Sequence, residues 1–220
     1  MKQKWSTGFR KFHTSLGVLI VLNLVASGCA ARPISQIHRF MYKDHLDSDS
    51  IHYISKVIEP AIQLYIPGGH WNVVQKPTFT VFETIKGPRK IINIFEFEDS
   101  FLKRKFHKIG FTGKQALEEY YRIESEHLIS KNAKQKSKII AVNIDGLITP
   151  NILWLVEGPD KQTFFISASK NRRLISISFQ DLDNPPNGQE SVTRIFQSMK
   201  FLSEEKVNEK WRQLFKIDGQ

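Results

Sequence analysis

The sequence has very little cysteine: Cys29 is the only one in 220 residues. A chain with one cysteine forms no internal disulfide, so this protein does not belong to the disulfide-stapled class of exported domains. The sequence also lacks an apolar run of the roughly 20 residues that a membrane-spanning helix needs, because its most apolar stretch, residues 16–26, is shorter. Acidic residues are absent from residues 1–28. These absences direct attention to the N-terminus.

The N-terminal segment has the three parts of a secretory signal peptide. A positively charged stretch over residues 1–15 precedes the apolar stretch over residues 16–26, and the small residues Ser27 and Gly28 follow. This order is typical of export signals, in which the apolar part spans about 7–15 residues. The sequence therefore predicts a signal peptide over residues 1–28. Its positive charges are Lys2, Lys4, Arg10 and Lys11.

The segment Ala26-Ser27-Gly28-Cys29 resembles the bacterial lipoprotein box, in which small residues precede an invariant cysteine. It departs from the usual pattern at Ala26, where such boxes usually carry Leu. The resemblance implies that a diacylglycerol is joined to the Cys29 sulfur, that the signal is cleaved, and that the new amino group is acylated. A thiolate is a good nucleophile for such a thioether. Two alternatives stay open: an ordinary signal peptide with an incidental cysteine, and an uncleaved N-terminal anchor.

The predicted lipid on Cys29 makes the bilayer the first expected partner. Each buried CH₂ contributes about 0.8 kcal/mol and one acyl chain anchors only marginally, so two or three chains would make attachment effectively permanent. Ala30 follows the cysteine. In the sorting systems that this arrangement resembles, Asp at that position favours the inner membrane, so Ala30 favours the periplasmic face of the outer membrane. An envelope protein is expected as a further partner.

The charge of the chain is basic, at +10 with 32 Lys and Arg against 22 Asp and Glu. Removing residues 1–28 removes four positive charges and no negative ones, which leaves +6. Because little nucleic acid is found beyond the inner membrane, anionic lipid or acidic polysaccharide is the expected counter-charge, and nucleic acid is not an expected partner. A polyanion binder would need the basic residues at 103–108, at 131–138 and at Arg172-Arg173 to share one face.

The most concentrated basic segment, residues 101–111, is a candidate contact for a membrane or a polyanion. Phe101 and Phe106 lie beside its positive charges, and such a mixture can rest on an anionic surface. The alternative is a solvated connector. The candidate contact residues are Lys103, Arg104, Lys105 and Lys108.

The mature chain is predicted to be a tether over residues 29–50 and a single α+β domain over residues 51–220. We expect one antiparallel sheet with one buried face against the helices. Hydrophobic periodicity predicts helices over 51–59, 113–131 and 189–202, and a tail helix with Val207, Trp211 and Leu214 inward. Alternation predicts strands over 61–66, 71–75, 78–85, 90–99, 138–145, 152–158, 162–169 and 172–180, with 78–85 and 90–99 as a hairpin.

Two segments resemble the Mog1/PsbP-like α/β/α sandwich proteins. Ile66-Pro67-Gly68-Gly69-His70-Trp71 resembles the opening of that group, a Pro, a short Gly turn and a Trp. Leu174–Gln180 followed by Ser191–Phe201 resembles its last strand and last helix. The likeness spans about residues 61–202. It implies the fold and a non-enzymatic accessory role, and it transfers no site residue.

Motifs for catalysis are missing from the sequence. It has no Gly-x-Ser-x-Gly elbow, no His-Glu-x-x-His pair and no P-loop spacing, and Cys29 is assigned to lipid. His38, His45 and His52 are seven residues apart, which on a helix is about 10 Å and too far for one ion. Glu124 and His127 fit a polar helix face. We therefore predict no catalytic, cofactor or metal residue and a non-enzymatic binding or accessory lipoprotein, with an envelope hydrolase as the alternative.

Overall fold

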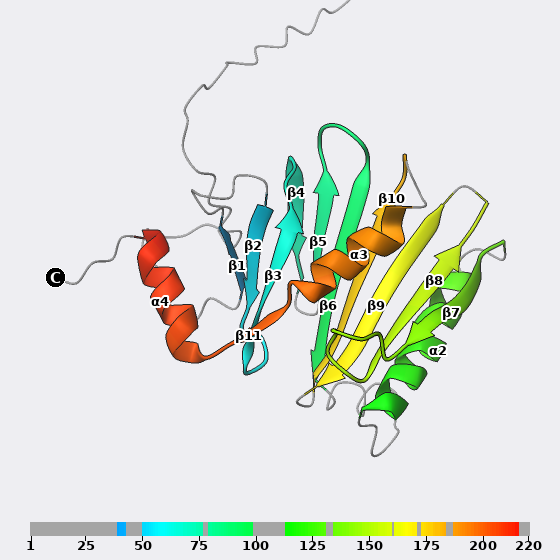
Figure 1. Cartoon of the computed structure of the whole chain (residues 1–220). Helices are drawn as coiled ribbons and strands as arrows, with labels where there is room; N and C mark the ends of the chain where they lie inside the picture. Colours follow the sequence, from blue (N-terminus) through cyan, green and yellow to red (C-terminus); the bar gives the residue numbers. More distant parts are fainter. Residues whose placement is uncertain are drawn as a thin grey trace, which may run out of the picture.

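The structure is a computed structural model that confirms the predicted α+β class. It describes residues 39–42, 50–76, 79–98, 113–130, 134–159, 161–170, 173–183 and 187–215. Antiparallel strands form two sheets, and helices cover them (Figure 1). No helix in these ranges is long and apolar enough to cross a bilayer.

The larger sheet has seven strands within the described ranges, in the order β4-β5-β6-β10-β9-β8-β7. Its β5–β6 hairpin and its β7-to-β10 meander are antiparallel, as the alternation of apolar residues predicts. The strands are β4 (Trp71–Gln75), β5 (Phe79–Thr84), β6 (Lys90–Glu98), β7 (Lys136–Val142), β8 (Asn151–Glu157), β9 (Gln162–Lys170) and β10 (Arg173–Asp181).

A smaller sheet of four described strands, in the order β1-β2-β3-β11, lies beside the larger one (Figure 1). Its first two strands correct the sequence analysis. The helix predicted over 51–59 is wrong, and the tether predicted over 29–50 is wrong for residues 39–42, whose apolar side chains are buried. The strands are β1 (Arg39–Tyr42), β2 (Ser50–Ser55), β3 (Ala61–Pro67) and β11 (Lys200–Leu202).

The helix prediction failed at β2 because both faces of this strand are buried. Tyr53 belongs to the core shared by the two sheets, whereas Ile54 belongs to a cluster on the outer face of the small sheet. Apolar residues on both faces remove the period-two alternation that marks a half-buried strand.

Helices α2 (Lys114–Ser130) and α3 (Gly188–Gln197) cover opposite faces of the large sheet (Figure 1). Successive residues of β8 show this arrangement, because Trp154 packs with Leu117 of α2 and Leu155 packs in the cluster that contains Phe196 of α3. The expectation of one buried sheet face is therefore wrong for this sheet. The helix predicted over 189–202 ends at Gln197, and residues 200–202 form β11 instead.

The outer face of the small sheet is covered by α4 (Glu204–Phe215). Val207 and Trp211 are buried there against Phe40 and Ile54, which confirms the inward side predicted for these two tail residues. The side chain of Leu214 lies outside the described part of the chain.

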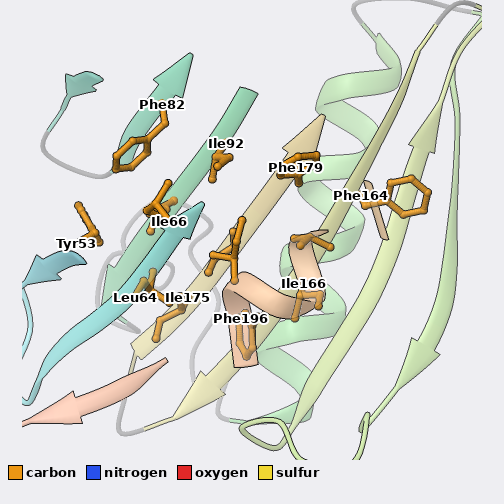
Figure 2. Packing of buried hydrophobic residues seen from close by; sticks show 14 of the residues in the cluster. Tyr53, Leu64, Ile66, Phe82, Ile92, Phe164, Ile166, Ile175, Phe179 and Phe196 are labelled. Carbon is orange, nitrogen blue, oxygen red and sulfur yellow. The ribbon is translucent and has the colours of Figure 1, made fainter. Parts of the chain in front are cut away.

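The main core joins the two sheets and α3. Figure 2 shows Tyr53 and Leu64 of the small sheet gathered with Phe82 of the large sheet and Phe196 of α3. Because one cluster draws on all three, the sheets share a core instead of each having its own.

The first turn of α3 contacts this core without room for a side chain. A Cβ on Gly188 would lie 2.6 Å from Cδ2 of Phe164, whose ring is buried and cannot move aside. Gly188→Ala should therefore lower the free energy of unfolding by about 1–3 kcal/mol through overpacking. Urea unfolding measures the change, with the exposed neighbour Gln189→Ala as the control, which should stay within about 0.5 kcal/mol. Equal stability of both variants would contradict the tight packing.

Candidate functional site

The residues singled out for lipid and membrane contact lie outside the described part of the chain. This holds for Cys29 and for the basic group Lys103, Arg104, Lys105 and Lys108. Their assignments stay predictions.

Of the three histidines spaced seven residues apart, the structure describes His52, which lies on a strand and not on a helix. His52 is buried on β2, and its ring stacks on Tyr42 and meets Tyr65 edge-on, each with centroids 4.4 Å apart. Its Nδ1 lies 2.9 Å from Nε2 of Gln63. This arrangement makes His52 a packed core histidine of the small sheet. In the described ranges, no group of three or more His, Cys, Asp and Glu side chains could hold a metal ion.

A buried ion pair lies where the two sheets meet. Arg173 Nε of β10 and Glu96 Oε1 of β6 are 3.3 Å apart, and both side chains are 1 % exposed. The register places Glu96 opposite Ile175, so Arg173 lies two residues away on the same face. Neighbouring strands of the large sheet thus bring opposite charges together on a face that is otherwise apolar.

Hydrogen bonds extend this ion pair into the small sheet. Ser55 at the end of β2 donates from its hydroxyl to Glu96 Oε2 at 2.5 Å. Arg173 Nη2 donates to the carbonyl oxygen of Pro60, at 2.6 Å, and to that of Ile58. The cluster therefore ties the β2–β3 connection to the centre of the large sheet, and we call these residues (Ser55, Ile58, Pro60, Glu96 and Arg173) the inter-sheet clamp.

Burial opposes the charges that the clamp contains. It raises the pKa of Glu96 above its ordinary value, and the Arg173 guanidinium and the Ser55 hydroxyl partly offset this effect. Burial likewise lowers the pKa of Arg173, against the attraction of Glu96. Nearby, burial raises the pKa of Tyr53 to about 12, and its hydroxyl lies 3.1 Å from Thr80 Oγ1. These groups contact one another inside the protein, which gives them a structural role.

The clamp corrects one hypothesis about the surface. A polyanion-binding face was expected to require Arg172-Arg173, but Arg173 is enclosed and paired. The sequence did contain a signal for its partner, since Glu96 is in phase with Ile92 and Ile94 on the buried face of β6. A charged residue on an apolar strand face indicates a buried partner of opposite charge.

The surface feature that stands out is the outer edge of β7, which ends the large sheet. Three of its apolar side chains face solvent: Ile139 is 43 % exposed, Ile140 38 % and Val142 55 %. Lys136 and Lys138 of the same strand are also exposed. The sequence analysis began this strand at Lys138, whereas it already begins at Lys136. The basic residues and the apolar ones thus share one sheet edge.

Comparison with known proteins identifies no family for this chain. No family model matches it, and no curated protein does. Among solved structures, it is similar to cyanobacterial PsbP (CyanoP) from Synechocystis sp. PCC 6803, with 13% identity, coverage of 80% of this chain and 98% of that one, and a TM-score of 0.46. A crystal structure from Bacteroides thetaiotaomicron VPI-5482 has 11% identity, coverage of 72% and 60%, and a TM-score of 0.34.

Proposed function

We propose that the protein is a lipid-anchored envelope lipoprotein that works as a non-enzymatic binding or accessory module. The observation that carries the proposal is the segment Ala26-Ser27-Gly28-Cys29, which follows a basic and then an apolar stretch and contains the only cysteine of the chain. Acylation of Cys29 would hold the folded domain at a membrane surface without a spanning helix.

The roles of the buried ionisable groups support binding over catalysis. Glu96 and Arg173 neutralise each other between the sheets, and His52 is enclosed by two tyrosines and Gln63. A general acid, base or nucleophile has to reach a substrate, and these groups are committed to the interior. The exposed sheet edge at β7, by contrast, is available for contact with another surface.

The proposed location is the periplasmic face of the outer membrane. It rests on Ala30 directly after the acylated cysteine, in place of the Asp that favours inner-membrane retention in comparable sorting systems. At that location the bilayer is one partner and an envelope protein is the other. Lys103, Arg104, Lys105 and Lys108 would add contacts with anionic headgroups.

Substitution of the proposed lipid site tests this function. Cys29→Ala should abolish incorporation of a fatty-acid label in growing cells and release the protein from the membrane fraction, because no acyl chain can then be attached. Ser35→Ala, within the predicted tether, is the matched control and should keep both label and membrane association. Continued labelling of Cys29→Ala would contradict the proposal. An unlabelled wild-type protein that stays on the membrane would favour an uncleaved anchor instead.

A further inference from the structure

We infer that the outer edge of β7 is a membrane-contacting strip, in which Ile139, Ile140 and Val142 enter the boundary of an anionic bilayer while Lys134, Lys136 and Lys138 meet its headgroups. The inference rests on the proposed function and deepens it, because a lipid anchor on Cys29 would hold the folded domain at a bilayer. We call these six residues the β7 strip.

The apolar part of the β7 strip is exposed where the same sheet face is otherwise buried. Ile139 and Val142 lie opposite Trp154 and Ile152 of β8, and both of these partners are buried under α2. Across an antiparallel pair, opposite side chains share a face. The apolar surface under α2 therefore continues outward onto β7 and ends in side chains that face solvent. An exposed apolar patch bordered by polar residues is typical of a contact site.

The geometry of β7 disfavours pairing with another strand. The register with β8 shifts between Ile139 and Ala141, so Ile140 is an extra residue in a β-bulge. Bulges and edge lysines are the devices by which proteins prevent a sheet edge from adding a strand. The exposed isoleucines therefore fit a surface that buries side chains without forming backbone hydrogen bonds to β7, as a bilayer does.

The charges of the β7 strip fit an anionic lipid surface. Lys134, Lys136 and Lys138 are all exposed. Lys138 forms an ion pair with Glu157 of β8, in which Nζ and Oε2 are 3.3 Å apart. Lysine stems lie along apolar surface while their ammonium groups stay in water, which is the geometry at a headgroup boundary. Attraction between lysines and an anionic leaflet falls off within about one Debye length, so it acts only when the protein is held at the membrane.

β1, the first described strand after Cys29, and the β7 strip lie at opposite ends of the row of strands (Figure 1). The ten residues from Cys29 to Arg39 span at most about 36 Å when fully extended. A domain held by the anchor at one end and by the strip at the other would lie along the bilayer instead of standing away from it.

A nitroxide label on β7 tests this inference in the full-length protein, acylated in cells and reconstituted in vesicles of phosphatidylethanolamine and phosphatidylglycerol. Acylation blocks the Cys29 sulfur, so Ile140→Cys supplies the only free thiol. The matched control is Ile85→Cys. Ile85 is 64 % exposed and directly follows β5, which lies near the edge of the large sheet opposite to β7. Collisions with a water-soluble nickel complex should be about threefold fewer at position 140 than at position 85, and collisions with lipid-soluble oxygen more frequent.

Two comparisons test whether the contact at position 140 depends on anionic lipid and on the lysines of the β7 strip. Vesicles of phosphatidylcholine alone, or the added substitutions Lys136→Gln and Lys138→Gln, should remove most of the protection from nickel at position 140. Equal nickel access at positions 140 and 85 in anionic vesicles would overturn the inference. So would protection that appears only with added envelope proteins, or dipolar broadening between copies, since these results indicate a protein partner or self-association.

The same samples separate this inference from the anchor itself. The parent protein takes up the label only if Cys29 is not acylated, which would count against the proposed function. In that case the difference between the spectra of Ile140→Cys and the parent still reports the surroundings of position 140.

Discussion

Arg173→Leu is expected to destabilise the protein by about 3–5 kcal/mol at neutral pH, because it leaves a buried carboxylate without its cation. Glu96 is 1 % exposed, and Arg173 is the larger of its stabilising partners, ahead of the Ser55 hydroxyl. The substitution also leaves the carbonyl groups of Ile58 and Pro60 without the donor that Arg173 provides. The loss should appear as a lower urea midpoint.

The double variant Arg173→Leu with Glu96→Gln is the matched control for this prediction. The new amide at position 96 fills nearly the same volume as the carboxylate of Glu96 and carries no charge. Its oxygen can still accept a hydrogen bond from the Ser55 hydroxyl. Replacing both partners of a buried ion pair costs much less than removing one of them. The double variant should therefore recover most of the stability lost in the single variant. A double variant as unstable as Arg173→Leu would show that packing of the arginine, and not charge, holds the sheets together.

The loss of folding stability caused by Arg173→Leu should also depend on pH. Burial raises the pKa of Glu96 above its ordinary value of 4.5, so the folded state holds this proton more tightly than the unfolded chain does. The stability contributed by that proton is complete below pH 4.5 and is lost as the pH rises through the raised pKa. Without Arg173 the pKa rises further, so the variant should approach the wild type in acid. A penalty that is constant with pH would contradict an ionised Glu96 in the clamp.

The second large effect is expected for Trp154→Ala, at about 3–5 kcal/mol. Trp154 is fully buried on β8, and its ring stacks on Phe165 with centroids 3.9 Å apart and meets Tyr121 of α2 edge-on at 5.3 Å. Its Nε1 donates to the hydroxyl of Ser167 at 3.1 Å. Truncation to Ala would leave a cavity between the sheet and α2. The helix cannot move in far enough to fill this cavity, because its other contacts hold it in place.

Two measurements separate this local effect from general damage. Trp154→Phe keeps an aromatic ring and loses the donor to Ser167, so its loss of stability should be clearly smaller than that of Trp154→Ala. Because α2 contacts this ring through Tyr121, protease cleavage within α2 should increase in Trp154→Ala before cleavage at α3 does. Equal cleavage of both helices would mean that the two faces of the sheet unfold together.

Much of the fold could be predicted because its elements have a clear period. The β5–β6 hairpin alternates apolar and polar residues around Gly87-Pro88, and α2 repeats Ala116, Leu117 and Tyr120 at helical spacing. The failures have two physical causes. In β2, apolar residues face both the main core and α4, so their spacing mimicked a helix. At β11, a short strand is defined by its pairing with β3, which neighbouring residues do not reveal.

The polar features of the structure were predictable only in part. Glu96 could be recognised as buried from its phase with Ile92 and Ile94, but the identity of its cation depends on which strand lies beside β6. That neighbour is β10, far away in the sequence. The exposure of Ile140 depends on a bulge and on β7 being the last strand of the sheet, and both follow from tertiary pairing. Local sequence patterns contain neither kind of information.

Closure of the small sheet by β11 and α4 has a consequence for the timing of folding. β11 pairs with β3 through Phe201 and Ile62, and Trp211 of α4 covers Phe40 of β1. β1 and β3 therefore lack these partners until residues 200–211 have been delivered, and contacts of such high sequence separation form slowly. A chain exported as the proposed signal requires would cross the membrane before it could commit to its native fold. Late assembly would thus keep it competent for translocation without a dedicated unfolding step.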